Sequence, residues 1–260
     1  MPGFAQLQPR QKRLVTELQQ VAGGLSRGDA LGILQAANWD VQLAADLFYS
    51  GSWPAAGATA QPEPAVDTTK IEAWFERYHD SEVPDTMQIE GIAKFCEDLQ
   101  VSPEDPVLLV ISKHFGAENM MVFTKAEFVA GMTSIQVDSL EDLIAALPRL
   151  RAQLEDPGSF KEVYNFTFKW ACPPGQKSMP VETAVAFWQL LLPGSFALLP
   201  EWCTYVEANR KHAISRDEWQ LLLDFARTVD KELNGYDENA AWPVVIDTFV
   251  EHLQAQRAAA

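Results

Sequence analysis

The sequence lacks the features that mark secretion, membrane insertion and metal binding. No stretch approaches the run of about 20 apolar residues that a membrane-spanning helix needs. The N-terminal segment has no apolar signal-peptide core, and no glycine follows Met1 for myristoylation. The three cysteines, Cys96, Cys172 and Cys203, are an odd number without metal-ligand spacing. We therefore expect free thiols in a reducing compartment, the cytoplasm or the nucleus.

Catalytic motifs are missing as well. The four histidines have no nearby cysteine or histidine at metal-ligand spacing, and the nucleophile-elbow, phosphate-loop and dinucleotide glycine patterns are absent. A nucleophilic cysteine needs an electropositive setting, whereas Cys96 precedes Glu97 and Asp98, which would raise the pKa of its thiol. The sequence predicts a protein with no active site, no metal and no cofactor of its own.

Positive charge is scarce. The chain holds 20 basic and 36 acidic residues, a formal net charge of −16. Residues 1–50 contain four of each sign, so the whole excess of negative charge lies in residues 51–260. An acidic surface opposes binding to a nucleic-acid backbone and favours a basic protein partner. The alternative is that the excess charge serves solubility alone.

One segment of low complexity divides the chain. Residues 51–67, GSWPAAGATAQPEPAVD, are rich in alanine, glycine and proline and keep no apolar period, which is typical of a flexible linker. The hydrophobic content of 47% suits a soluble protein that buries a core. We predict a small domain at residues 8–50 and a larger one at residues 68–254.

The small domain shows three short helical patterns. The third follows Trp39 and Asp40 and carries Val41, Ala44 and Phe48 at helical spacing. This pattern resembles the third helix of a ubiquitin-associated (UBA) domain, so we predict a three-helix UBA-like bundle. The resemblance implies a ubiquitin contact near Leu47 and Phe48. A small helical module with another partner, or with none, is the alternative.

The larger domain is expected to be all-α, with about ten helices between KIEAWFERY and WPVVIDTFVEHL. Two of its hairpins resemble degenerate EF-hands, with Ile89 and Phe123 at the strand positions. A calcium loop needs several oxygen ligands and a closing glutamate, but Ala93 and Met120 stand at ligand positions. We expect hairpins that serve packing and bind no metal.

Several stretches of the larger domain occur in an order typical of one family. They are IEGIAKFCEDL, FTKAEFVAGM, DSLEDL, FKEVYNFTFKWA followed by PGQK, AVAFWQLLL, RDEWQLLLDF and YDENAAWPVVIDTFVE. Together they run from Lys70 to Glu251 and resemble the potentiating-neddylation domain of the defective-in-cullin-neddylation family. A UBA-like module precedes that domain here, as it does in the family.

The resemblance implies a scaffold and not an enzyme. Members of the family act as co-ligases in cullin neddylation, binding the cullin C-terminal winged-helix region and the acetylated N-terminus of the neddylation conjugating enzyme. The RING subunit and the conjugating enzyme carry out the reaction. A ubiquitin-binding adaptor and an EF-hand-like regulatory protein are the alternative functions.

Two sites follow from the resemblance. The first is an acidic cullin-binding patch at Asp217, Ala241 and Asp247. The local charge supports it, because the segment from Asp224 to Glu251 contains seven acidic residues and only two basic ones. An ordinary solvated helix face is the alternative. The second is a pocket for the acetylated methionine of the conjugating enzyme, for which a plain core is the alternative. Its expected residues are Ile89, Ile92, Leu108, Ile111, Phe115, Phe123, Trp170, Phe187 and Leu190.

Overall fold

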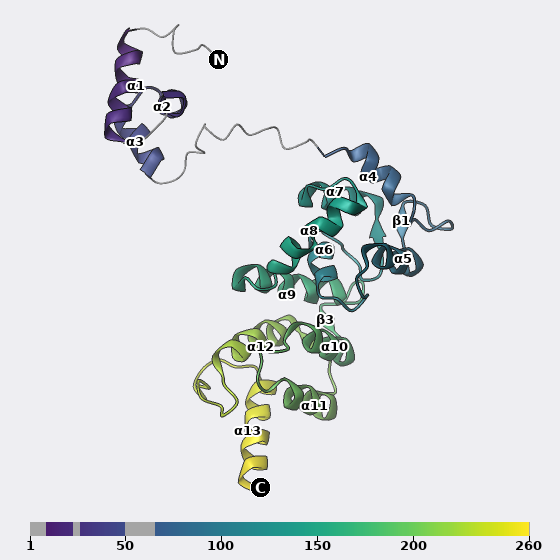
Figure 1. Cartoon of the computed structure of the whole chain (residues 1–260). Helices are drawn as coiled ribbons and strands as arrows, with labels where there is room; N and C mark the ends of the chain where they lie inside the picture. Colours follow the sequence, from purple (N-terminus) through teal and green to yellow (C-terminus); the bar gives the residue numbers. More distant parts are fainter. Residues whose placement is uncertain (1–8, 23–26, 50–65, 260) are drawn as a thin grey trace. The chain divides into compact units, whose positions relative to one another are not determined.

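The computed structural model describes residues 9–22, 27–49 and 66–259 (Figure 1). The chain divides into two compact units, Met1–Ala65 and Val66–Ala260. Both are helical, so the predicted all-α class is confirmed. The predicted linker at residues 51–67 lies outside the described residues, apart from its last two positions.

The first unit is a bundle of three helices: α1 (Pro9–Val21), α2 (Arg27–Ala36) and α3 (Val41–Tyr49). Its small core is formed by Val15, Leu18, Ala30, Ile33, Leu34, Ala37 and Ala44. Asp40 begins α3 because its carboxylate accepts hydrogen bonds from the backbone N–H groups of Gln42 and Leu43, at 2.9 and 3.1 Å. The predicted UBA-like bundle of three helices is therefore present.

The second unit contains ten helices and four short strands within its described residues. The helices are α4 (Thr68–Phe75), α5 (Ile89–Leu99), α6 (Val107–Phe115), α7 (Lys125–Ile135), α8 (Leu140–Ala152), α9 (Pro157–Ala171), α10 (Val181–Leu191), α11 (Leu199–Asn209), α12 (Arg216–Thr228) and α13 (Val244–Ala259). The strands are β1 (Thr86–Met87), β2 (Phe123–Thr124), β3 (Ser178–Met179) and β4 (Ile214–Ser215).

Strands β1 and β2 join the helix pairs α4–α5 and α6–α7. They are antiparallel, and Met87 lies opposite Phe123. The expected strand position of Ile89 is therefore wrong by two residues, because Ile89 is the first residue of α5 and its side chain is 60% exposed. Met87, which is fully buried, takes the inward position that the sequence pattern assigned to Ile89.

A second pair of strands, β3 and β4, joins α9–α10 to α11–α12 in the same way, with Met179 opposite Ile214. The sequence did not predict this pair, because two residues are too few to show a strand period. The EF-hand likeness of the first pair stays a prediction. At its second loop, the carboxylate of Glu127 accepts hydrogen bonds from the backbone N–H groups of Glu118 and Thr124.

A buried aromatic group fixes α9, α10 and α12 to one another. The rings of Tyr164 and Trp219 are stacked with their centroids 4.4 Å apart, and the ring of Trp188 is stacked on Trp219 with a centroid distance of 5.5 Å. The Tyr164 hydroxyl donates to the carbonyl of Trp219 and accepts from Nε1 of Trp188, at 2.9 and 3.0 Å. Because every polar side-chain atom of the group has a partner, the group fixes α9, α10 and α12 relative to one another.

Candidate functional site

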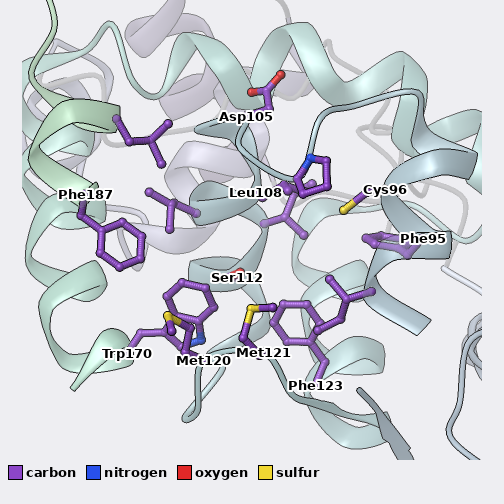
Figure 2. Close-up of a pocket in the computed structure, with 15 residues that line it drawn as sticks. Phe95, Cys96, Asp105, Leu108, Ser112, Met120, Met121, Phe123, Trp170 and Phe187 are labelled. Atoms are coloured by element: carbon purple, nitrogen blue, oxygen red, sulfur yellow. The ribbon is translucent and has the colours of Figure 1, made fainter. Parts of the chain in front are cut away.

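The second unit contains a partly open cavity of about 180 Å³ between α5, α6, α9, α10 and the segment that leads into β2. Figure 2 shows the side chains that surround it. The lining residues are Ile92, Phe95, Cys96, Pro103, Asp105, Leu108, Leu109, Ile111, Ser112, Met120, Met121, Phe123, Trp170, Phe187 and Leu190. We call this cavity the pocket.

The chemistry of the pocket suits an uncharged, apolar ligand. Its one charged lining residue, Asp105, is already bound: its carboxylate accepts hydrogen bonds from the guanidinium of Arg151 and from the backbone N–H of Val107. A cavity of about 150 Å³ in another protein holds one benzene molecule. The pocket therefore has room for about one side chain, and a second charge inside it would lose its hydration without gaining a partner.

Seven of the nine residues expected at the pocket line it: Ile92, Leu108, Ile111, Phe123, Trp170, Phe187 and Leu190. The other two do not. Ile89 begins α5 and points into solvent, while Phe115 is buried behind the pocket wall, where its ring packs edge-on against Phe123 at 5.0 Å. Ile111 and Phe115 are one turn apart on α6, but only Ile111 borders the pocket, and Phe115 belongs to the core behind it.

Eight lining residues were not expected from the sequence: Phe95, Cys96, Pro103, Asp105, Leu109, Ser112, Met120 and Met121. Helix spacing could have found some of them, since Phe95 and Cys96 follow Ile92 by three and four residues. Pro103 and Asp105 precede α6 in an irregular segment, where no periodic pattern indicates the direction of a side chain.

The mouth of the pocket contains two methionines. Met120 and Met121 are 40% and 41% exposed and stand in the segment between α6 and β2. This segment is tied to α9 because Nε1 of Trp170 donates to the carbonyl of Asn119 at 2.9 Å. Met121 adopts a left-handed backbone conformation, with φ of 66°. Since methionine side chains adapt their shape easily, the mouth is adjustable while the walls behind it are packed.

The cysteines of the chain are poorly suited to nucleophilic chemistry. Cys96 and Cys203 are buried, Cys172 is half-buried, and all three are free. Burial raises the pKa of the Cys96 thiol, so the acids that follow Cys96 are not the cause that the sequence indicated. Burial and the charge of Glu207 raise the pKa of Cys203 to about 11. All three thiols are thus protonated at neutral pH.

A group of acids surrounds one tyrosine near the start of α13. The hydroxyl of Tyr236 donates to Oδ1 of Asp247 at 2.7 Å. Burial raises the pKa of Tyr236 to about 12, and the carboxylates of Asp247, Glu251 and Glu238 add to this rise. These three carboxylates, Glu238, Asp247 and Glu251, form what we call the acidic cluster.

The structure places the three expected cullin-binding residues in two locations. Ala241 is exposed just before α13, and Asp247 is half-buried in the first turn of that helix. Asp217 is exposed in the first turn of α12, eight residues before Phe225, or about 12 Å along the helix axis. The rings of Tyr236 and Trp242 lie against Phe225, so Ala241 and Asp247 belong to the other end of α12.

The residues expected to contact ubiquitin lie partly inside the first unit. Leu47 and Phe48 are half-buried and pack against its core. Among the described residues of the bundle, the exposed large apolar side chains are those of Val21, Leu43 and Tyr49, at 51%, 50% and 67%. Val21 belongs to α1, and Leu43 and Tyr49 belong to α3. The ubiquitin contact near Leu47 and Phe48 stays a prediction.

Within residues 9–22, 27–49 and 66–259, no three histidine, cysteine, aspartate or glutamate side chains are grouped so that they could hold a metal ion. Nor does the described part of the chain contain a helix with the length and apolar character needed to span a bilayer.

Comparison with known proteins relates both units to known families. Residues 142–252 match the family described as "Cullin binding", and residues 12–54 match the "UBA-like domain". The cullin-binding match begins in α8 and ends in α13, so it contains Asp217, Ala241 and Asp247, while part of the pocket lies before it.

Individual relatives are similar over most of the chain. The chain is 39% identical to DCN1-like protein 4 of Drosophila melanogaster over 185 residues, which are 71% of this chain and 75% of the relative. It is 40% identical to DCN1-like protein 5 of Rattus norvegicus over 182 residues, 70% of this chain and 76% of the relative. Human DCN1-like protein 5 is 39% identical over 189 residues, 73% of this chain and 79% of the relative. The chain belongs to the DCN1-like protein family.

Proposed function

We propose that this protein is a scaffold-type co-ligase that promotes cullin neddylation without an active site of its own. It binds the cullin C-terminal winged-helix region and the acetylated N-terminus of the neddylation conjugating enzyme. The RING subunit and the conjugating enzyme supply the chemistry. Holding two reactants together makes their reaction effectively intramolecular, so a protein without a catalytic residue can still raise the rate.

The pocket is the observation that carries the proposal. An acetylated N-terminus has no charge on its α-nitrogen, and the pocket offers an apolar enclosure in which a charged amine would lose its hydration. Burial of a methionine side chain there would contribute about 1.5–3 kcal/mol to binding. The size of the pocket, about 180 Å³, is in keeping with one such side chain.

The acidic cluster supports the contact with a cullin. Asp247 and Glu251 are one turn apart on α13, and the nearby Ala241 has no side chain long enough to keep a partner at a distance. Negative charge of this kind attracts a basic surface and speeds the encounter. Asp217 adds a second point of negative charge at the start of α12.

The function is tested by reconstituted cullin neddylation with and without the full chain. We expect the chain to raise the rate, and the double variant Asp217→Arg with Asp247→Arg to remove both cullin binding and stimulation. Glu141→Arg is the matched control, because Glu141 is also an exposed acid in the first turn of a helix, α8. Stimulation that survives in the double variant would show that the cullin binds elsewhere.

The pocket is tested separately by calorimetry with a peptide of the conjugating-enzyme N-terminus. We expect the acetylated peptide to bind the full chain at least about tenfold more tightly than the same peptide with a free amine. Equal affinities for the two peptides would exclude the pocket as a site for an acetylated methionine.

A further inference from the structure

The wall of the pocket contains a buried serine whose hydroxyl makes no hydrogen bond to the described part of the chain. Ser112 stands on α6, is only 2% exposed and lines the cavity. Figure 2 shows its oxygen in the middle of the ring of lining side chains. This hydroxyl makes no hydrogen bond to another described residue, so the protein itself leaves its hydrogen-bonding capacity unused.

Other helical hydroxyls of this protein satisfy themselves locally. A serine or threonine inside a helix commonly donates to the carbonyl one turn earlier. Thr133 does so to Val129 at 2.7 Å, and Thr167 does so to Val163 at 2.9 Å. The equivalent bond from Ser112 is absent, which leaves its hydroxyl free to serve a molecule that enters the pocket.

The other polar groups around the cavity are already in use. The carboxylate of Asp105 is bound by Arg151 and Val107, and Nε1 of Trp170 donates to Asn119. Cys96 contributes a thiol, which is a weak donor. Among the lining side chains, Ser112 is therefore the one strong hydrogen-bonding group that a ligand would find available.

We infer that the Ser112 hydroxyl donates a hydrogen bond to the side chain that the pocket receives, and so selects an apolar side chain that carries an acceptor atom. The thioether sulfur of methionine is such an atom. This inference rests on the proposed function, which places an acetylated N-terminal residue in the pocket. It adds that Ser112 is a specificity-determining residue, because a hydrocarbon side chain of the same length would leave the hydroxyl buried and unpaired.

The test compares two acetylated peptides that differ only in the first residue, methionine or norleucine, which replaces the sulfur with a methylene group. Calorimetry with the full chain should show about three- to tenfold tighter binding of the methionine peptide. In Ser112→Ala the two affinities should agree within about twofold, mainly because the methionine peptide binds less tightly.

Ser134→Ala is the matched control. Ser134 lies on α7, outside the pocket lining, and its hydroxyl donates to the carbonyl of Gly131 at 2.9 Å. This variant should keep the wild-type preference for methionine. Loss of the preference in Ser134→Ala as well would overturn the inference, because the effect would then not belong to the Ser112 contact.

Thermal unfolding of the unliganded protein provides a second readout. Removal of an unpaired hydroxyl should leave the Tm of Ser112→Ala equal to or above that of the wild type. A Tm lower by more than about 3 °C would show that Ser112 supports the fold, and would overturn the inference.

The outcomes separate the inference from the proposed function. Failure of every acetylated peptide to bind the wild type would overturn both. Tight binding with the same methionine preference in wild type and Ser112→Ala would leave the proposed function intact and overturn the role of Ser112 alone. Equal weakening of both peptides in Ser112→Ala would do the same, because the hydroxyl would then contact an atom that the two share.

Discussion

The pocket and the acidic cluster differ in how their side chains are held. Four helices supply most of the pocket walls, and the buried group of Tyr164, Trp188 and Trp219 fixes two of those helices, α9 and α10. The acidic cluster stands instead around one half-buried tyrosine, Tyr236, in the middle of the irregular segment between α12 and α13. The core thus sets the shape of the pocket, whereas the acidic cluster combines two carboxylates of α13 with Glu238 and Tyr236 of the irregular segment before it.

This difference implies two kinds of recognition. Binding to the pocket depends on the exclusion of water from apolar surface, which gives selectivity for the size and charge of one side chain. Binding to the acidic cluster depends on electrostatic attraction, which favours fast encounter and weakens as salt screens the charges.

The largest effect is expected from a charge placed in the pocket wall. Leu108→Arg introduces a guanidinium into the cavity, where it would block the ligand and lose its hydration, so the affinity for an acetylated methionine peptide should fall at least about 100-fold. Calorimetry measures the loss, and cullin binding should persist. Ile144→Arg is the control, because Ile144 is an exposed aliphatic residue on α8 outside the pocket. Comparable losses in both variants would indicate general destabilisation.

The second largest effect is the dependence of the two binding affinities on salt concentration. Between about 50 mM and about 500 mM sodium chloride, the affinity for the cullin should fall about tenfold, because exposed charges more than a Debye length apart are screened. The affinity for the acetylated peptide should change less than about twofold over the same range. Titrations of both partners at several salt concentrations measure this contrast. A strong salt dependence of peptide binding would contradict the assignment of the pocket as an apolar site.

The same contrast explains which parts of the molecule the sequence could predict. Apolar residues recur every three or four positions in each helix, because each helix turns one face to the core, and this period predicted the ten helices of the second unit. The period does not tell which core-facing residues border a cavity. Ile111 and Phe115 are four residues apart on α6, yet only Ile111 lines the pocket.

The features that the sequence could not predict lie mostly in irregular segments. Met120 and Met121 reach the pocket from a segment that has no period, and the bond from Trp170 to Asn119 ties this segment to α9. The contact between Tyr236 and Asp247 joins two residues that are eleven positions apart across a loop. The charge of the acidic cluster could be read from the sequence, but its arrangement around a tyrosine depends on the folded chain.

A smaller effect is expected on the pKa of Tyr236 when Asp247 loses its charge. Its pKa of about 12 lies above the ordinary value of 10, so the folded state favours the neutral phenol. The associated stability is fully present below pH 10 and is lost as the pH rises through about 12. Asp247→Asn removes a hydrogen-bonding carboxylate and should lower the pKa of Tyr236 towards 10, which NMR of labelled tyrosine measures. Glu141→Gln, on α8, should leave it unchanged.

The smallest effect is expected from Tyr236→Phe. The variant loses the bond from the phenol to Asp247 but keeps the three carboxylates, so the Tm should fall by about 2–4 °C while cullin affinity changes less than about threefold. Tyr205→Phe is the control, since the described structure shows ring contacts for Tyr205 but no hydrogen bond from its hydroxyl. A larger loss of cullin affinity would mean that recognition needs the fixed orientation of Asp247. The acidic cluster would then resemble the pocket, because its geometry would matter as much as its charge.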